Sequence, residues 1–96
     1  MKIIEIKKIE NCLEGKNVWD ILLNSPLTKS FVSGFSSMGK VVVHDFKPKP
    51  FFQLIVRGKF TLKGSIGNMS FRMLMPDEAG TEQIDIVKQH IENSSL

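Results

Sequence analysis

The stretch "FFQLIVRGKFTLKGSI" (residues 51–66) decides the fold, because its apolar side chains recur at every second position. From position 52 the even positions are apolar or glycine, and the odd positions are mostly polar or charged. This period of two places successive side chains on opposite faces of a β-strand. Strands usually contain about 5–6 residues, so we expect one bent strand or two strands that break near Gly58. A two-residue turn at positions 58–59 would put Arg57 opposite Phe60 on one face, and this mismatch favours a bend or a longer loop.

A second hairpin is predicted directly after this stretch. The dipeptide "GN" at 67–68 suits a tight turn, and the following "MSFRMLM" predicts the returning strand. This turn places Met73 opposite Leu62 and Phe71 opposite Gly64. The apolar faces of the two strands therefore agree.

The segment before the stretch predicts one more strand and a stiff connection. Residues 40–46, "KVVVHDF", hold three consecutive valines, which indicates a strand that is buried on both faces. The following "KPKP" cannot belong to a sheet interior, because proline lacks the backbone N–H that a ladder needs. We expect it to connect two strands.

The N-terminal part of the chain predicts a strand followed by a helical region. Residues 2–9 are rich in isoleucine and indicate a strand. We expect residues 18–24 to form a short helical segment with Asn17 as its N-cap. A second helix is expected after Ser25 and Pro26, with Gly39 as its left-handed terminal residue.

The C-terminal segment "TEQIDIVKQHIENSS" predicts an amphipathic helix. Ile84, Val87 and Ile91 fall on one stripe, and Thr81 is the expected N-cap. Such a helix would cover the apolar face of the sheet. The predicted fold is thus a single α+β domain over residues 1–96. It comprises an antiparallel meander of four to five strands, an N-terminal helical region after the first strand, and a C-terminal helix packed on the sheet.

The composition of the chain indicates one globular domain and a cellular location. The chain has 96 residues, 42% of them hydrophobic and 24% charged, which is typical of one globular domain. Its single cysteine, Cys12, cannot form an internal disulfide, and we therefore expect a cytoplasmic location. The charged N-terminus has no signal-peptide pattern, and no apolar run is long enough to span a membrane.

The sequence contains no pattern that fixes a catalytic or metal site. The candidate metal ligands Cys12, His44 and His90 lack any recognised ligand spacing, and whether they converge in space is left open. No nucleophile elbow is present, and the "GSIG" at 64–67 lies in a predicted hairpin rather than between two helices. We therefore expect no cofactor and no metal, and we favour a protein that is not an enzyme.

The charge distribution singles out one sheet face as a candidate binding surface. Residues 40–72 carry seven Lys or Arg and one acid, whereas residues 73–96 carry one Lys and five acids. Four basic side chains are predicted on the polar face, with two apolar side chains that interrupt it: Phe51, Ile55, Arg57, Lys59, Lys63 and Arg72. Lys63 and Arg72 would be direct cross-strand neighbours.

Three functions fit this face and are left open at this stage. The leading hypothesis is a small protein-interaction or accessory module that self-associates as a homo-oligomer or binds a protein partner. The first alternative is weak, sequence-independent nucleic-acid (RNA) binding through the basic residues. It is weakened because most phenylalanines fall on the opposite face, where bases could not stack on them. The second alternative is a small-ligand or enzymatic pocket between sheet and helices.

Overall fold

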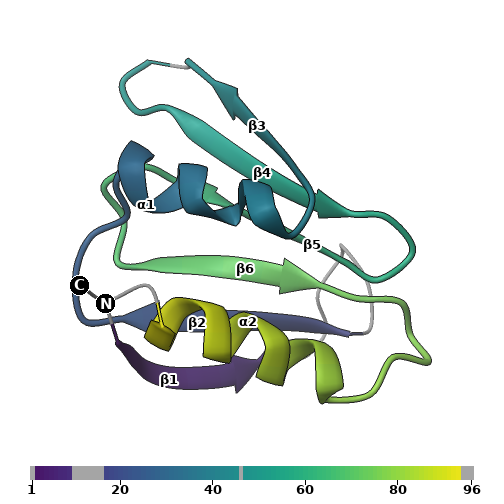
Figure 1. The fold of residues 1–96 in the computed structure, drawn as a ribbon. Helices are drawn as coiled ribbons and strands as arrows, with labels where there is room; N and C mark the ends of the chain where they lie inside the picture. The colour runs from purple at the N-terminus through teal and green to yellow at the C-terminus, as the bar shows by residue number, and fades with distance from the viewer. Residues whose placement is uncertain (1, 10–16, 46, 94–96) are drawn as a thin grey trace.

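A six-stranded antiparallel sheet organises the chain and carries its helices on one face (Figure 1). The computed structural model describes residues 2–9, 17–45 and 47–93. The elements in chain order are β1 (Ile3–Lys8), β2 (Val18–Leu23), α1 (Lys29–Ser33), the 3-10 helix η1 (Gly34–Ser37), β3 (Lys40–His44), β4 (Phe51–Val56), β5 (Phe60–Ser65), β6 (Ser70–Leu74) and α2 (Glu82–Asn93). The predicted α+β class, the antiparallel sheet and the C-terminal helix are confirmed.

The strand order in the sheet is β1-β2-β6-β5-β4-β3. Strands β3 to β6 follow one another as the predicted meander, and the β1–β2 hairpin joins this meander at β6. The two outer strands are therefore β1 and β3, which Figure 1 shows at opposite sides of the sheet.

The predicted register of the β5–β6 hairpin is confirmed. Met73 pairs with Leu62, and a β-carbon at Gly64 would lie only 3.0 Å from the Cβ atom of Phe71. Residues 51–66 form two strands, because Val56 pairs with Phe60 across the intervening residues 57–59. Gly58 adopts a φ of 77° in this turn, a left-handed conformation that few other residues tolerate.

The prediction of a helical segment at residues 18–24 is wrong, and this region forms strand β2. Val18 and Ile21 point to opposite faces of the sheet, and both are buried. Because β2 carries apolar side chains on both faces, it lacks the alternation by which strands are detected, and a short apolar run of this kind cannot be told from a helix. The sheet consequently has six strands instead of the predicted four to five.

The helix predicted after Pro26 begins later than expected, at Lys29. Thr28, and not Ser25, is the N-cap of α1, since its side-chain oxygen accepts a 3.0 Å hydrogen bond from the Phe31 backbone N–H. The helix changes to a 3-10 geometry at Gly34. Gly39 does not adopt a left-handed conformation; a β-carbon there would lie 2.5 Å from the Ile55 carbonyl oxygen, so close approach of β4 requires the glycine.

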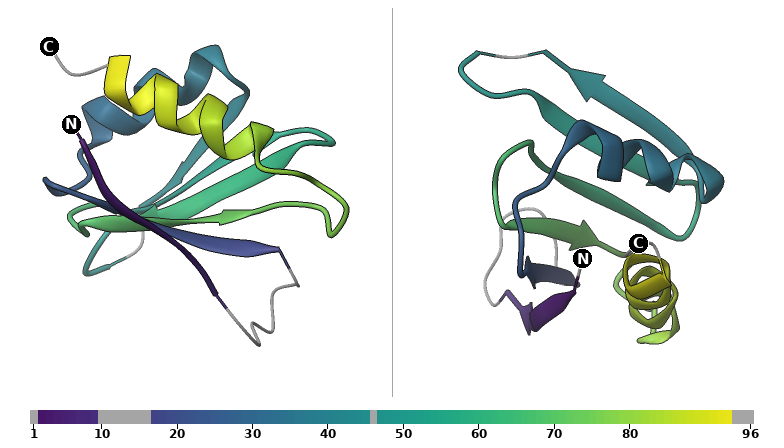
Figure 2. Two further views of the ribbon diagram at one scale, coloured as in Figure 1. Left: turned by 90° about the horizontal axis from the view of Figure 1, so that it is seen from below. Right: turned by 60° about the vertical axis from the view of Figure 1, so that its left-hand side comes forward.

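All described helices lie on one side of the sheet, as the left view of Figure 2 shows. Phe35 of η1 is fully buried, with its ring centroid 6.2 Å from those of both Phe52 and Phe71. Ile84, Val87 and Ile91 of α2 are buried as predicted. No helix among the described residues is long and apolar enough to cross a membrane.

Strand β3 differs from its prediction in one respect. Its three valines indicate a strand buried on both faces, yet β3 lies at the edge of the sheet, where Val43 remains 41% exposed. An edge strand has a neighbour on one side only, so its side chains lack half of the packing that a central strand receives.

Candidate interaction surface

The candidate functional site is the side of the sheet that faces away from α1, η1 and α2, which we call the helix-free face (Figure 2). Its side chains follow from the strand registers, because residues directly opposite each other in an antiparallel sheet point to the same side. They form a charged central row between two rows that contain apolar side chains.

The central row consists of Lys7, Asp20, Arg72, Lys63, Gln53 and Val42. The first flanking row includes Leu22, Ser70, Ser65, Phe51 and His44. The second flanking row consists of Val18, Leu74, Thr61, Ile55 and Lys40. The face thus places hydrogen-bonding groups at its middle and apolar groups on both sides of them.

The predicted neighbours Lys63 and Arg72 do pair across β5 and β6. The other neighbour of Arg72 is Asp20 of β2, whose Oδ1 atom accepts a 3.3 Å hydrogen bond from the Arg72 Nε. Sequence reasoning missed Asp20, because residues 18–24 were predicted to be helical. This acid offsets part of the positive charge in the middle of the face.

Several apolar side chains of the flanking rows are partly exposed, whereas Val18 is buried. Ile55 is 40% exposed and Leu22 is 37% exposed, although both lie on central strands. Phe51 is half-buried and packs near His44, with the two ring centroids 6.3 Å apart. These side chains provide apolar contact area on both sides of the charged row.

The structure divides the six predicted site residues among three places. Ile55, Arg57 and Lys59 line a groove of about 330 Å³ at the β4–β5 turn, on the side where Leu74 also lies. Arg57 and Lys59 flank Gly58 in the turn between β4 and β5.

The other three predicted residues lie away from the turn. Lys63 and Arg72 occupy the centre of the helix-free face, and Phe51 lies at the end of β4 that is distant from the turn. The six predicted residues therefore lie on the helix-free face and at the adjoining β4–β5 turn, and they do not line one common pocket. Its binding role stays a prediction.

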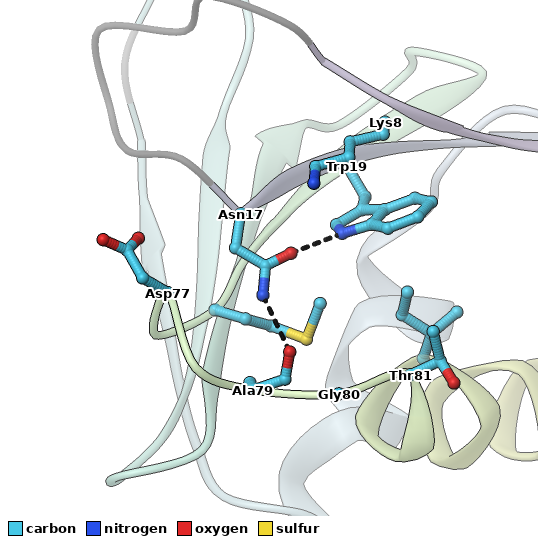
Figure 3. Close-up of a pocket in the computed structure, with 9 residues that line it drawn as sticks. Lys8, Asn17, Trp19, Asp77, Ala79, Gly80 and Thr81 are labelled. Atoms are coloured by element: carbon cyan, nitrogen blue, oxygen red, sulfur yellow. Dashed lines mark hydrogen bonds between the residues drawn. The ribbon is translucent and has the colours of Figure 1, made fainter.

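A separate cavity of about 330 Å³ lies beside Asn17 and Trp19, where β2 begins and the chain enters α2 (Figure 3). Asn17 is 8% exposed, and its amide nitrogen donates to the carbonyl oxygens of Pro76 at 3.0 Å and Ala79 at 3.1 Å. Its amide oxygen accepts a 2.8 Å hydrogen bond from the Trp19 indole N–H. Both N–H groups of the Asn17 amide donate to carbonyl oxygens inside the protein. We therefore assign Asn17 a structural role, which is to hold the connection between β6 and α2 in place.

The predicted metal candidates do not assemble into a site among the residues that the structure describes. No group of three or more His, Cys, Asp or Glu side chains suited to a metal ion occurs in this part of the chain. His44 lies on the helix-free face, whereas His90 stacks on Phe35 on the helix side, with ring centroids 5.1 Å apart. Cys12 lies outside the described residues.

Comparisons with known proteins do not assign this chain to a class. No protein-family model, curated protein sequence or solved structure matches it. Its function must therefore be argued from the surface described above.

Proposed function

We propose that this protein is a non-enzymatic interaction module that self-associates and that, through the helix-free face, binds a protein partner. The observation that carries the proposal is that no described helix packs on this side of the six-stranded sheet and that, although Val18 is buried there, Leu22 and Ile55 are partly exposed. Sheets with one solvated face usually show polar side chains on that face. Apolar groups in that position are favourable when another surface covers them.

The composition of the face favours a protein partner. Protein interfaces combine apolar contact area with a limited number of hydrogen bonds that fix orientation. On the helix-free face, Asp20 and Arg72 supply paired polar groups at the centre, and Leu22 and Ile55 supply apolar area on either side. A partner that covers this face would desolvate both apolar rows at once.

A photo-crosslinking pair tests the partner-binding part of the proposal. A photoreactive phenylalanine analogue at Ile55 reports on the helix-free face, and the same analogue at Ile86 reports on the outer side of α2. The two positions are matched in exposure, at 40% and 46%. We expect discrete covalent adducts in living cells from position 55 and none from position 86. The absence of adducts at position 55, or equal adducts at both positions, would contradict the assignment of this face.

Self-association is tested separately on the purified chain. Sedimentation equilibrium over roughly 5–500 µM covers the affinities expected of a modest interface. We expect the weight-average mass to rise from the monomer value of 10.9 kDa towards twice that value. A constant monomer mass throughout would reject the self-association part and leave the crosslinking result unaffected.

Nucleic-acid binding is the weaker, second proposal. Lys63 and Arg72 are adjacent on the helix-free face, and Arg57 and Lys59 extend the positive charge to the β4–β5 turn. Of the phenylalanines that could stack on bases, Phe52, Phe60 and Phe71 are buried in the core. Binding of this type would weaken steeply as the salt concentration rises. A titration with labelled single-stranded RNA at low and at physiological salt tests it, and the absence of binding at low salt would exclude it.

The remaining alternative is a small ligand in the cavity beside Trp19. Trp19 is the one tryptophan of the chain, so its fluorescence reports directly on this cavity. A screen of small molecules that leaves this emission unchanged would count against the ligand proposal. A cytoplasmic location is part of the leading proposal and is supported by the single cysteine.

A further inference from the structure

The two edges of the sheet are protected to different degrees. The outer strand β1 has a register irregularity between Ile3 and Glu5, and it carries exposed Lys7 and Lys8. Bulges and charged side chains are the usual means by which proteins prevent an edge strand from pairing with another chain. The β1 edge is therefore protected.

The edge at β3 has weaker protection. Strand β3 pairs with β4 over five consecutive residue pairs without a register shift, so it is regular along its length. Its three central residues are Val41, Val42 and Val43, and its only charged residue is Lys40 at the first position. In the described part of the chain no strand pairs with its outer side. A regular, apolar edge strand presents unpaired backbone N–H and C=O groups to another strand.

The sequence of β3 is that of a central strand. Consecutive valines are typical of strands whose two faces are both covered, and this is why the sequence predicts burial on both sides. In the folded chain Val43 is nevertheless 41% exposed on the helix side, next to a core in which its partner Phe52 is fully buried. One additional strand beside β3 would cover Val43 and satisfy the outer backbone groups.

We infer that this strand is β3 of a second copy, which pairs antiparallel with the first about a two-fold axis at Val42. This inference rests on the self-association stated in the proposed function and specifies its interface. The two six-stranded sheets join into one continuous sheet. The helices of both copies lie on the same side of it, because the axis is perpendicular to the sheet.

The register is self-complementary, and this favours a second copy over an unrelated strand. With the axis at Val42, that residue meets its own counterpart on the helix-free face. Val41 meets the second copy's Val43 on the helix side, and the reverse pair forms by symmetry. Residues directly opposite in an antiparallel pair share a side of the sheet, so all three valines are matched to valines. Lys40 and the second copy's His44 meet at the two ends, where water remains in contact with them.

The pairing also extends the candidate interaction surface. Val42 and His44 belong to the helix-free face, so joining two sheets at β3 joins two helix-free faces side by side. A partner would then meet two identical surfaces related by the two-fold axis. Engagement of both would increase its apparent affinity without any new contact.

A set of lysine substitutions distinguishes this interface from its alternatives. Val43→Lys places a charge in the inferred interface at a position that is already 41% exposed, so the fold should tolerate it. Ile55→Lys tests the helix-free face at 40% exposure, and Ile4→Lys tests the β1 edge at 61% exposure. By sedimentation equilibrium we expect Val43→Lys to raise the dimer dissociation constant by about tenfold or more, and the other two to change it by less than about threefold. Circular dichroism of each variant checks that the fold is retained.

Disulfide trapping provides a second measurement that does not depend on weakening the dimer. Directly opposite residues have Cα atoms about 4.5–5.5 Å apart, within the range of about 4.4–6.8 Å that a disulfide can bridge. In a Cys12→Ser background, Val42→Cys should form an intermolecular disulfide on mild oxidation, whereas Ile4→Cys on the opposite edge should not.

Each result has a defined meaning. Selective weakening by Val43→Lys together with trapping through Val42→Cys supports the β3 interface. A dimer that responds to Ile55→Lys or Ile4→Lys instead, or to none of the three, overturns the β3 interface but retains self-association. A wild-type chain that stays monomeric overturns self-association itself and the interface with it. Trapping through both cysteine variants indicates random collision and also overturns the assignment.

Discussion

At the scale of single residues, Asn17 shows how one buried amide can join distant parts of the chain. Its side chain contacts two carbonyl oxygens about 60 residues later in the sequence and the indole of Trp19. A buried carbonyl that loses its donor costs about 1–3 kcal/mol, so the two acceptors at Pro76 and Ala79 depend strongly on Asn17. The sequence predicts Asn17 as a helix N-cap, and this is wrong because strand β2 follows it. The sequence does not reveal the actual partners of Asn17, because they are separated from it by the whole meander.

We predict that Asn17→Asp lowers the free energy of unfolding by on the order of 3 kcal/mol at pH 7. An ionised carboxylate cannot donate to the two carbonyl oxygens, and burial beside them raises its pKa above the unfolded value of about 3.9. The loss relative to the wild type should therefore be smallest below about pH 4, where the protonated carboxyl still donates to one of the two carbonyl oxygens, and should grow as the pH rises through the folded pKa. Urea unfolding followed by Trp19 fluorescence at several pH values measures it.

Asn24→Asp is the matched control for this prediction. Asn24 is exposed, and its Oδ1 accepts from the Lys2 backbone N–H, a role that a carboxylate can also fill. We expect its free energy of unfolding to change by less than about 0.5 kcal/mol. Equal effects of the two substitutions would show that the Asn17 contacts do not stabilise the fold.

At the scale of elements, helix α2 illustrates a part of the fold that can be predicted. The stripe formed by Ile84, Val87 and Ile91 is a local pattern, and it requires only that some apolar surface be available to cover. The β5–β6 hairpin was predictable for the same reason, because the registers of Leu62 with Met73 and of Lys63 with Arg72 depend on a short turn. Both kinds of element are specified by neighbours in the sequence.

We predict that Ile91→Ala lowers the free energy of unfolding by about 2–5 kcal/mol, since Ile91 is fully buried. The same substitution at Ile86, which is 46% exposed on the same helix, should cost less than about 1 kcal/mol. The two substitutions remove the same atoms and have the same helix propensity change, so the difference measures burial alone. Similar losses in chemical denaturation of the two variants would contradict the packing of α2 on the sheet.

Strand β2 could not be predicted from local sequence patterns. Its segment has a plausible cap before it and no alternation of apolar and polar side chains. It is a strand because β1 and β6 provide hydrogen-bonding edges on both of its sides. Tertiary pairing therefore overrides local propensity.

At the scale of the whole molecule, the wrong prediction of a helix in place of β2 limited the prediction of the candidate surface. The sequence predicted the adjacent charges of Lys63 and Arg72 but not Asp20, because Asp20 reaches them only after β2 docks beside β6. The exposed edge of β3 was also beyond prediction, since the position of a strand within a sheet depends on the complete strand order.

The strand order also has consequences for folding kinetics. Asp20 and Arg72, which pair across β2 and β6, are separated by 52 residues, whereas β3 to β6 join through short connections. Closing a long loop costs more entropy than closing a hairpin, and distant pairings slow folding. We predict that backbone amides of β4 and β5 become protected before those of β2 in pulsed hydrogen-exchange labelling during refolding. Simultaneous protection of all six strands would contradict this order.

During synthesis this order delays the fold. Residues 3–23 leave the ribosome first, yet the strand that receives them, β6, ends at Leu74. The β1–β2 hairpin must therefore wait until β6 has been made, and a two-stranded hairpin is only marginally stable in water by itself. Nascent chains consequently expose the unpaired strands β1 and β2 until β6 has left the ribosome, and this interval is when they are most prone to aggregate.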